Sequence, residues 1–275
     1  MKRGSKLGAL TGNLRRKSAL AVMALLVAAA IALGHVHPFG DPRHSGGSES
    51  QGDLSASLRD QGFPAQARAV LVAKCADCHS NATRWPLYSR VAPVSWLIEH
   101  DVAEGRKRMN LSTWSTLTPD RKQELDSMIV SETRMGKMPP LQYRAIHWGA
   151  RLSREDLQAL SILSRQDGAA ETGSLGAGDA DRGKAIFERR CTGCHALDAN
   201  HEGPHLRGVY GRMAGSIADF RYSTALRESK FTWNDTLLNK WLTDPDAMLP
   251  GNNMEFRVVK ATERADIVAF LRQLK

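Results

Sequence analysis

Hydrophobic residues form one long run near the N-terminus and recur elsewhere at helical spacing. The run extends from Ala19 to Gly34, 16 residues, and follows six basic residues that end at Lys17. An apolar run behind a positive segment is typical of an export signal, and Ala32 and Gly34 are small residues of the kind found where a signal peptidase cleaves. The run falls a little short of the roughly 20 residues that span a bilayer. We therefore predict that residues 1–34 are a signal peptide or a membrane anchor, and that the rest of the chain lies outside the cytoplasm.

Two polar stretches divide the remaining chain into two segments of similar organisation. Residues 35–60 and 167–178 have few large apolar side chains and are expected to be linkers. Segments 61–166 and 179–275 each have a Cys-x-x-Cys-His motif near the start and a helical pattern at the end. A chain of 275 residues is long enough for two small domains.

Helix signals recur in both segments, and neither segment has sustained alternation of apolar and polar residues. Thr118 followed by Pro119 predicts a helix start, and Ser153 with Asp156 predicts a capping box. Thr262 is expected to cap a terminal helix. The apolar positions expected to be buried along these three helices are Leu125, Met128 and Ile129, then Leu157 and Leu160, then Ile267, Phe270, Leu271 and Leu274. The sequence therefore predicts an all-α fold of two small helical domains joined by a flexible linker and preceded by the N-terminal apolar helix.

The formal net charge of +9 is a property of the N-terminal segment. Six of the basic residues precede residue 18, which leaves about +3 for the remainder. Beyond them the chain has no basic run interleaved with aromatic residues. We therefore expect no nucleic-acid partner.

All four cysteines lie in pairs that are followed at once by histidine. Two cysteines at this spacing can reach both vinyl groups of one porphyrin, and the imidazole of the next residue then points at the iron. Thioether attachment makes the cofactor part of the chain, so that a small domain can retain it. The residues of the two motifs are Cys75, Cys78 and His79, and Cys191, Cys194 and His195.

Three other uses of paired cysteines explain the motifs less well. A structural zinc site requires the two pairs to meet, although 116 residues separate them. A thioredoxin-type pair requires a strand–helix–strand setting and leaves the histidines unexplained. Disulfides between such near neighbours remove little entropy from the unfolded chain. We therefore predict two covalently attached haem c groups.

A methionine follows each motif at the same interval. His79 precedes Met138 by 59 residues, and the second motif's histidine precedes Met254 by the same 59. Histidine with methionine is a standard axial pair for haem iron, and the two prolines after Met138 restrict its loop. We prefer Met138 as the sixth ligand of the first haem to the alternatives His100 and His147.

The second segment has many signature positions besides its motif. They are Gly183 and Phe187, Gly203-Pro204, Gly208-Val209-Tyr210-Gly211-Arg212, Tyr222, Phe231-Thr232-Trp233, Trp241-Leu242, Leu249-Pro250-Gly251 with Met254, and Ala269-Phe270-Leu271. By these residues, 179–275 resembles the class I cytochromes c, the small electron carriers of mitochondria and bacteria. It departs from them in having Trp241 where a tyrosine is common, Leu226 where many members have a polar residue, and few lysines of the kind that ring the haem edge.

The resemblance implies roles for particular residues. His195 and Met254 are expected to be the axial ligands, with the Pro204 carbonyl orienting His195. Gly183 is expected to let the first and last helices cross closely. The residues expected to hold the haem propionates are Arg212, Tyr222 and Trp233.

The first segment has its own dense set of signature positions. They are Cys78-His79-Ser80-Asn81 with Thr83, Trp85-Pro86, Tyr88-Ser89, Ala92-Pro93-Val94-Ser95-Trp96-Leu97, Asp101-Val102, Gly105-Arg106, Asn110, Ser112, Trp114 and Met138-Pro139-Pro140. By these residues, 61–166 resembles the haem-binding domain family, a small module with one haem. Trp85, Trp96 and Trp114 are expected to form the wall of the haem cavity and the core.

These observations together predict a carrier that passes single electrons between redox proteins of an electron-transport chain. Two alternatives are a dihaem enzyme of the peroxidase type, in which one iron stays five-coordinate, and an electron-transfer subunit of a larger oxidoreductase. The sequence offers no further cavity lined by acid and base groups, which favours a carrier. We expect a periplasmic protein, either soluble after signal cleavage or tethered to the inner membrane through residues 18–36.

Overall fold

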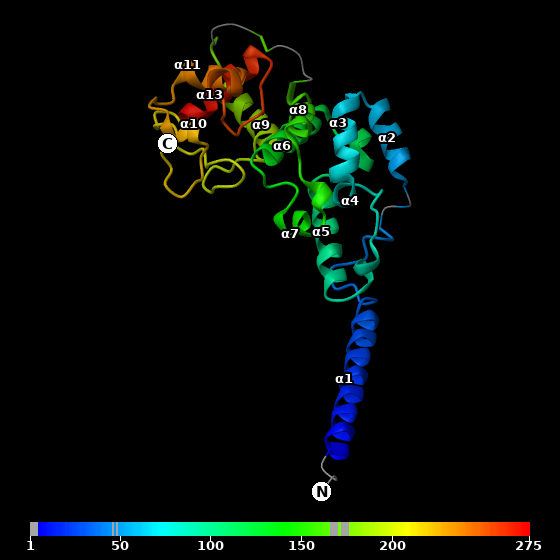
Figure 1. The fold of residues 1–275 in the computed structure, drawn as a ribbon. Coiled ribbons are helices and arrows are strands. Elements are labelled where there is room, and N and C mark those ends of the chain that lie inside the picture. Colours follow the sequence, from blue (N-terminus) through cyan, green and yellow to red (C-terminus); the bar gives the residue numbers. More distant parts are fainter. Residues whose placement is uncertain (1–4, 46, 48, 166–169, 172–175) are drawn as a thin grey trace. The chain divides into compact units, whose positions relative to one another are not determined.

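The computed structural model describes residues 5–45, 47, 49–165, 170–171 and 176–275. Within these residues all the regular secondary-structure elements are helices and there is no β-strand, which confirms the all-α prediction (Figure 1). The predicted linker 167–178 lies mostly outside the described residues.

The described chain divides into two compact units. Unit 1 consists of the described residues of Met1–Leu54 together with Cys75–Ser112, and unit 2 consists of Ser55–Lys74 together with Thr113–Lys275. Each unit therefore contains one of the two Cys-x-x-Cys-His motifs. The domain boundaries expected from the sequence stay a prediction.

The first element of unit 1 is α1 (Ser5–Leu33), which contains the apolar run. Its segment Arg16–Leu33 is long and apolar enough to cross a membrane, with a mean hydropathy of 1.9, and none of that segment is buried in the protein. Such a helix near an N-terminus fits both a signal sequence and an anchor.

Two further helices of unit 1 hold the first motif. Helix α4 (Ala76–His79) packs against α5 (Val94–Arg108), and the short turn η2 (Leu87–Arg90) packs against the same helix. Gly105 of α5 permits the close approach, because a Cβ there would lie 2.7 Å from the carbonyl oxygen of Cys78.

The segment that follows α1 is held against α5 by polar contacts. Glu99 of α5 is fully buried, and its Oε1 lies 3.0 Å from Nδ1 of His37 and 3.6 Å from Nε of Arg43. Arg106 donates hydrogen bonds to the carbonyl oxygens of Pro42, at 2.6 Å, and Ser45, at 2.9 Å. This part of the predicted linker 35–60 thus lies on unit 1. The end of the linker forms α2 (Gln51–Asp60), which continues into unit 2.

Unit 2 contains the remaining helices. They are α3 (Ala65–Val70), α6 (Pro119–Arg134), α7 (Leu141–Ile146), η4 (Trp148–Ala150), α8 (Arg154–Ser161), η5 (Leu163–Arg165), α9 (Ala180–Arg190), α10 (Thr224–Glu228), α11 (Asp235–Thr243), α12 (Pro245–Met248) and α13 (Ala261–Gln273). Three elements extend from one unit into the other: α2, η1 (Leu71–Cys75) and η3 (Leu111–Thr116).

Local signals predicted two of the three helix starts. The Thr118 side chain accepts a hydrogen bond from the Arg121 N–H at the start of α6, and Ser153 and Asp156 form the capping box of α8. The prediction for Thr262 is wrong, because α13 begins one residue earlier and its N-cap is Lys260. Since Thr262 lies inside the first turn, its hydroxyl does not occupy the capping position.

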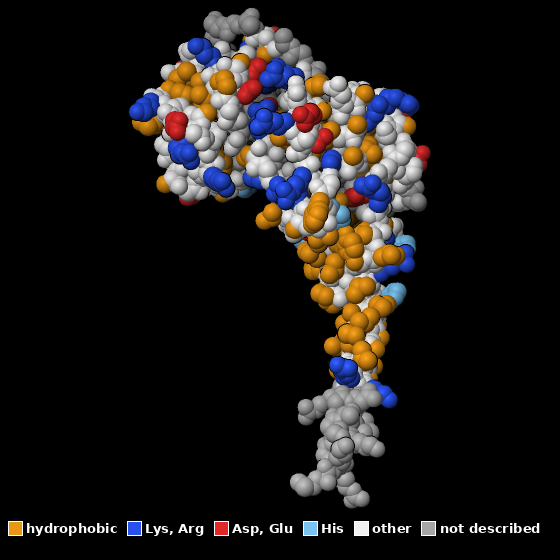
Figure 2. All heavy atoms as spheres, viewed as in Figure 1, with side chains coloured by type: hydrophobic (Ala, Val, Ile, Leu, Met, Phe, Trp, Pro, Cys, Tyr) orange, Lys and Arg blue, Asp and Glu red, His pale blue; other side chains and the backbone are white. Residues whose placement is uncertain are grey.

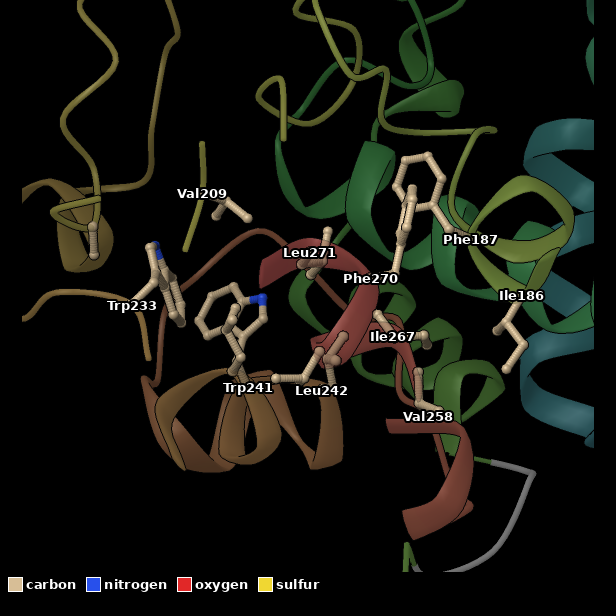
Figure 3. Close-up of a cluster of buried hydrophobic side chains, with 13 residues drawn as sticks. Ile186, Phe187, Val209, Trp233, Trp241, Leu242, Val258, Ile267, Phe270 and Leu271 are labelled. Atoms are coloured by element: carbon tan, nitrogen blue, oxygen red, sulfur yellow. The ribbon is translucent and has the colours of Figure 1, made fainter. Parts of the chain in front are cut away.

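The core of unit 2 forms around the crossing of α9 and α13. A Cβ on Gly183 of α9 would lie 2.0 Å from the carbonyl oxygen of Asp266 in α13, so that only glycine allows this approach. Phe187 and Phe270 pack beside it with ring centroids 5.5 Å apart. Figure 3 shows this cluster continuing through Leu271 and Ile267 to Trp241 and Trp233.

Candidate haem sites

The second motif opens onto a large cavity in unit 2. Cys191 is the C-cap of α9, and Cys194 and His195 follow in a turn. The cavity has a volume of about 780 Å³, and the two cysteines, His195 and Met254 all line it. The residues at the end of α9 thus place two thiols and one imidazole in the cavity that the Met254 thioether also lines.

The imidazole of His195 is oriented by the backbone. Its Nδ1 lies 2.8 Å from the carbonyl oxygen of Pro204, and a Cβ on Gly203 would lie 2.2 Å from the ring. Burial lowers the pKa of His195, which favours the neutral ring. A neutral imidazole that donates from Nδ1 keeps the lone pair of Nε2 for a metal.

Burial has the opposite effect on the pKa of the cysteine thiols. It raises the pKa of Cys191 and of Cys194 to about 12 in each case. The thiols are therefore neutral at physiological pH, and conversion to thioethers removes no buried charge.

A braced loop presents Met254 to the cavity. Asn252 is 1% exposed, and its side chain accepts a hydrogen bond from the Met254 N–H at 2.7 Å and donates one to the Leu249 carbonyl at 3.0 Å. The indole Nε1 of Trp241 donates to the Met254 Sδ at 3.0 Å. The backbone and the sulfur of Met254 are thus both held in place.

The residues expected to hold propionates line the same cavity. Arg212, Tyr222 and Trp233 all contribute to its wall, and Arg212 donates to the carbonyl oxygens of Arg207 and His205 at 3.1 and 2.9 Å. Burial lowers the pKa of Arg212 and raises that of Tyr222. A partly buried guanidinium beside a neutral phenol can receive a carboxylate from a ligand.

Helix α6 forms a wall of this cavity that the sequence did not predict. Met128 of α6 lines the cavity, as do Ser127 and Ser131. Ser131 Oγ donates to the carbonyl oxygen of Asn253 at 2.7 Å, and Gln123 Nε2 donates to that of Arg257 at 2.9 Å.

An ion pair adds to the same contact. Arg134 of α6 pairs with Glu255, the residue after Met254, and burial raises the pKa of that carboxyl. Helix α6 therefore holds the loop that carries Met254 from both sides of the methionine. Local sequence patterns do not predict the hydrogen bonds of Gln123 and Ser131, because more than 100 residues separate each donor from its acceptor.

The first motif has a comparable arrangement in unit 1. Nδ1 of His79 lies 2.9 Å from the carbonyl oxygen of Gly105 and 3.2 Å from that of Met109, at the end of α5. Burial lowers the pKa of His79 and raises that of Cys78 to about 12. Cys75, one turn earlier, is partly buried. As at the other motif, a main-chain carbonyl orients the imidazole and leaves Nε2 free.

The sixth ligand of the first centre stays a prediction. Met138 is partly buried and lies in the loop after α6, in unit 2. His100 is about half exposed and lies 3.6 Å from Asp101. His147 stacks on Tyr143 with ring centroids 4.0 Å apart.

The three tryptophans of the first segment have separate surroundings. Trp85 lies under the guanidinium of Arg43, at 4.5 Å from the ring centroid. Trp96 donates to the Val36 carbonyl at 2.8 Å. Trp114 is 2% exposed and packs edge-on against Phe63 in unit 2. Trp114 is therefore a core residue, and the assignment of the other two to a cavity wall stays a prediction.

The donor set in unit 2 fits haem c. Two thiols, an imidazole with a free Nε2 and a thioether line one cavity, and these are the groups that attach haem c and ligate its iron through histidine and methionine. Among the described residues, no group of three or more His, Cys, Asp and Glu side chains is placed to hold a metal ion directly.

Comparisons with known proteins match both segments. Residues 38–166 match the family model described as haem-binding domain, and residues 180–275 match the one described as cytochrome c. Cytochrome c of Euglena viridis is 43% identical over 101 residues, which are 36% of this chain and 99% of that protein. Cytochrome c of Chlamydomonas reinhardtii is 41% identical over 101 residues, 35% of this chain and 90% of that protein. Among solved structures, cytochrome cH from Methylobacterium extorquens has 39% sequence identity and a TM-score of 0.33 over 34% of this chain and 98% of its own.

Proposed function

Because the chain belongs to the cytochrome c family, we propose that it is a dihaem c-type cytochrome that passes single electrons between redox proteins outside the cytoplasm. Membership of the family supports electron transfer by haem. The second haem, the location and the identity of the axial ligands are the proposal.

One observation supports two haems above all others. In both units a histidine directly after a cysteine pair has its Nδ1 against a main-chain carbonyl, at 2.9 Å for His79 and 2.8 Å for His195. This hydrogen bond fixes the ring and leaves Nε2 as the only free nitrogen. The carbonyl belongs to Gly105 in one unit and to Pro204 in the other, and it orients the imidazole in the same way. This supports iron binding by both histidines.

The residues of unit 2 have separable roles in such a carrier. Bound haem supplies a one-electron couple at iron. His195 and Met254 would hold the iron, and a thioether ligand favours the ferrous state and raises the reduction potential. Cys191 and Cys194 would prevent loss of the group, and Arg212 with Tyr222 would receive its propionates.

We also propose that α1 is retained as an anchor in the inner membrane. Its last turn is part of the packing of unit 1: the Ala92 N–H donates to the Ala30 carbonyl at 3.0 Å. Gly34 lies so close to Arg90 that a Cβ on it would be 2.1 Å from the carbonyl oxygen. Cleavage after Gly34 would remove these contacts. Arg15, Arg16 and Lys17 directly precede the apolar part of α1. Basic residues favour the cytoplasmic side of a membrane helix, which supports a periplasmic position for unit 1.

The haem content of the purified chain tests the proposal. The full chain, matured in an export host competent for cytochrome c assembly, is expected to contain two haems by pyridine haemochrome assay and intact mass. Replacing Cys75 and Cys78 by Ala should leave one haem, and replacing Cys191 and Cys194 should leave the other. A colourless chain with the mass of the apoprotein would overturn the proposal, and a high-spin haem with peroxide turnover would indicate an enzyme instead of a carrier.

A further inference from the structure

Unit 1 exposes a group of apolar side chains next to the end of α1. We call this group the apolar collar. Single exposed apolar residues are common on soluble proteins, but a group of them beside one structural feature marks an interaction surface. Its members, with their exposed fractions, are Val36 (53%), Phe39 (54%), Leu87 (84%), Tyr88 (36%), Val94 (40%) and Leu97 (51%). Figure 2 shows hydrophobic side chains continuing from α1 onto the adjoining end of this unit.

The collar is attached to α1 by short contacts. Ala92, between η2 and α5, donates to the Ala30 carbonyl at 3.0 Å. The Trp96 indole of α5 donates to the Val36 carbonyl at 2.8 Å. Phe39 packs edge-on against His100, with ring centroids 5.1 Å apart. Because both chain segments of the collar are fixed to the helix end, the collar cannot move far from it.

The length of α1 determines where a bilayer must end. The 18 residues of Arg16–Leu33 span about 27 Å at 1.5 Å per residue, which is close to the roughly 30 Å hydrocarbon core. With Arg16 and Lys17 at the cytoplasmic headgroups, Leu33 lies at the outer boundary of the core. Val36 then follows within one helical turn, at the depth of the outer headgroups.

We propose that the apolar collar is inserted into the outer headgroup and upper acyl region of the bilayer that holds α1. Unit 1 then contacts the lipid surface directly and is not attached to the membrane through α1 alone. The aromatic side chains support this depth, since Tyr88 and Trp96 have an apolar body and a polar tip, the type enriched at membrane interfaces. The inference depends on the proposal that α1 is a retained anchor.

Docking of the collar would fix the height of the first haem site. Leu97 belongs to the collar, and Gly105, whose carbonyl orients His79, lies eight residues further along α5. Eight residues of helix correspond to about 12 Å. A docked unit 1 therefore holds His79 at a constant distance from the membrane, where a membrane-bound redox partner can meet it repeatedly in the same orientation.

Spin-label accessibility in a lipid bilayer tests the docking. We would reconstitute the full haem-loaded chain into nanodiscs of phosphatidylcholine and phosphatidylglycerol, with Leu97→Cys or Leu87→Cys carrying a nitroxide. Lys107→Cys is the matched control, because Lys107 is also exposed on α5 but lies near its other end. Accessibility to oxygen, which partitions into lipid, is compared with accessibility to a water-soluble nickel chelate. The visible spectrum of each variant verifies that its haems are in place.

The expected result is an oxygen-to-nickel accessibility ratio severalfold higher at positions 97 and 87 than at 107. An equal ratio at all three positions, with the chain still in the disc, would overturn the docking and leave the anchor intact. A label at 97 that neither reagent reaches would show that protein covers the collar, which also overturns it. Failure of the anchor gives a different result, because the chain then elutes without lipid. Failure of haem attachment is also distinguishable, because the unsubstituted chain would then take up the label on its own cysteines.

Discussion

The indole Nε1 of Trp241 donates a hydrogen bond of 3.0 Å to the sulfur of Met254. Trp241 lies in α11 and is only 8% exposed, so water does not compete strongly for the sulfur. A thioether sulfur has two lone pairs, of which an iron uses one and a hydrogen-bond donor can take the other. The donor withdraws electron density from the sulfur and so weakens its bond to ferric iron more than its bond to ferrous iron.

We therefore predict that Trp241→Phe lowers the reduction potential of the second haem. Loss of one hydrogen bond of about 0.5–1.5 kcal/mol corresponds to about 20–60 mV for a one-electron couple. Potentiometric titration monitored at the visible bands measures the change. Trp148→Phe is the matched control, because Trp148 is 82% exposed and should leave the potential unchanged. A rise in potential on removing Trp241 would contradict the interpretation.

The contacts between α6 and the loop that carries Met254 lead to a second prediction. Ser131→Ala removes the 2.7 Å hydrogen bond to the Asn253 carbonyl, and the loop then holds Met254 less firmly. Exogenous imidazole, which competes with the methionine for iron, should bind about two- to tenfold more tightly to the second haem, as expected for a loss of about 0.5–1.5 kcal/mol.

The methionine-to-iron charge-transfer band monitors this competition. Ser161→Ala is a suitable control, since the Ser161 hydroxyl also donates to a backbone carbonyl, that of Gln158 at 2.7 Å, but does not line the cavity. Equal imidazole affinity in both variants would show that α6 covers the loop without supporting the ligand.

Sequence reasoning succeeded where a local signal carries the structure. Thr118 and the pair Ser153 and Asp156 were recognised because a helix cap depends on residues three apart. Gly183 was placed correctly at the crossing of α9 and α13 through its resemblance to a family pattern. Thr262 was misassigned because a threonine near a helix start resembles a cap even when the helix begins one residue earlier.

The contacts that the sequence missed have no local signal. The carbonyl oxygen of Gly105 orients His79, but every residue has such an oxygen, and only the fold selects one of them. Ser131 contacts Asn253 across 122 residues. Leu97 lies on a stripe of apolar residues with Val94, Ile98 and Val102, a pattern typical of a buried helix face. Its exposure, and that of Leu87, therefore appears only in the structure.

Met138 gives a third prediction, which concerns the first haem. If its thioether is the sixth ligand, Met138→Ala leaves that iron five-coordinate, and the first haem becomes high-spin with a lower reduction potential. Magnetic circular dichroism and potentiometry distinguish this haem from the second. Met213→Ala is the control, because Met213 is 57% exposed. An unchanged spectrum in the Met138 variant would assign the sixth position to another residue, with His100 and His147 the next to replace.

The last prediction concerns the acid stability of unit 2. The Asp266 carboxylate in α13 accepts hydrogen bonds from Arg182 of α9, at 2.9 and 3.0 Å, and from the Asp179 N–H at 2.7 Å. The Arg182 guanidinium, followed by the backbone donor, holds the pKa of Asp266 below its ordinary value. A carboxyl whose pKa is lower in the folded state stabilises the fold above its unfolded pKa of about 3.9, and this stabilisation is lost as the pH falls toward the folded value.

Asp266→Asn should therefore lower the free energy of unfolding at pH 7 by about 1 kcal/mol, a discounted value because the Arg182 side chain reaches solvent. The difference from the natural chain should shrink on acidification below pH 4, where the natural carboxylate also becomes protonated. Urea unfolding of the haem-loaded chain, monitored by circular dichroism at each pH, measures both values. Asp198→Asn is the control: Asp198 pairs with Arg207 in a similar geometry but is 68% exposed, so solvent screens the pair and the stability should change little. A deficit in the Asp266 variant that is the same at both pH values would show that the side chain acts through packing alone, without its charge.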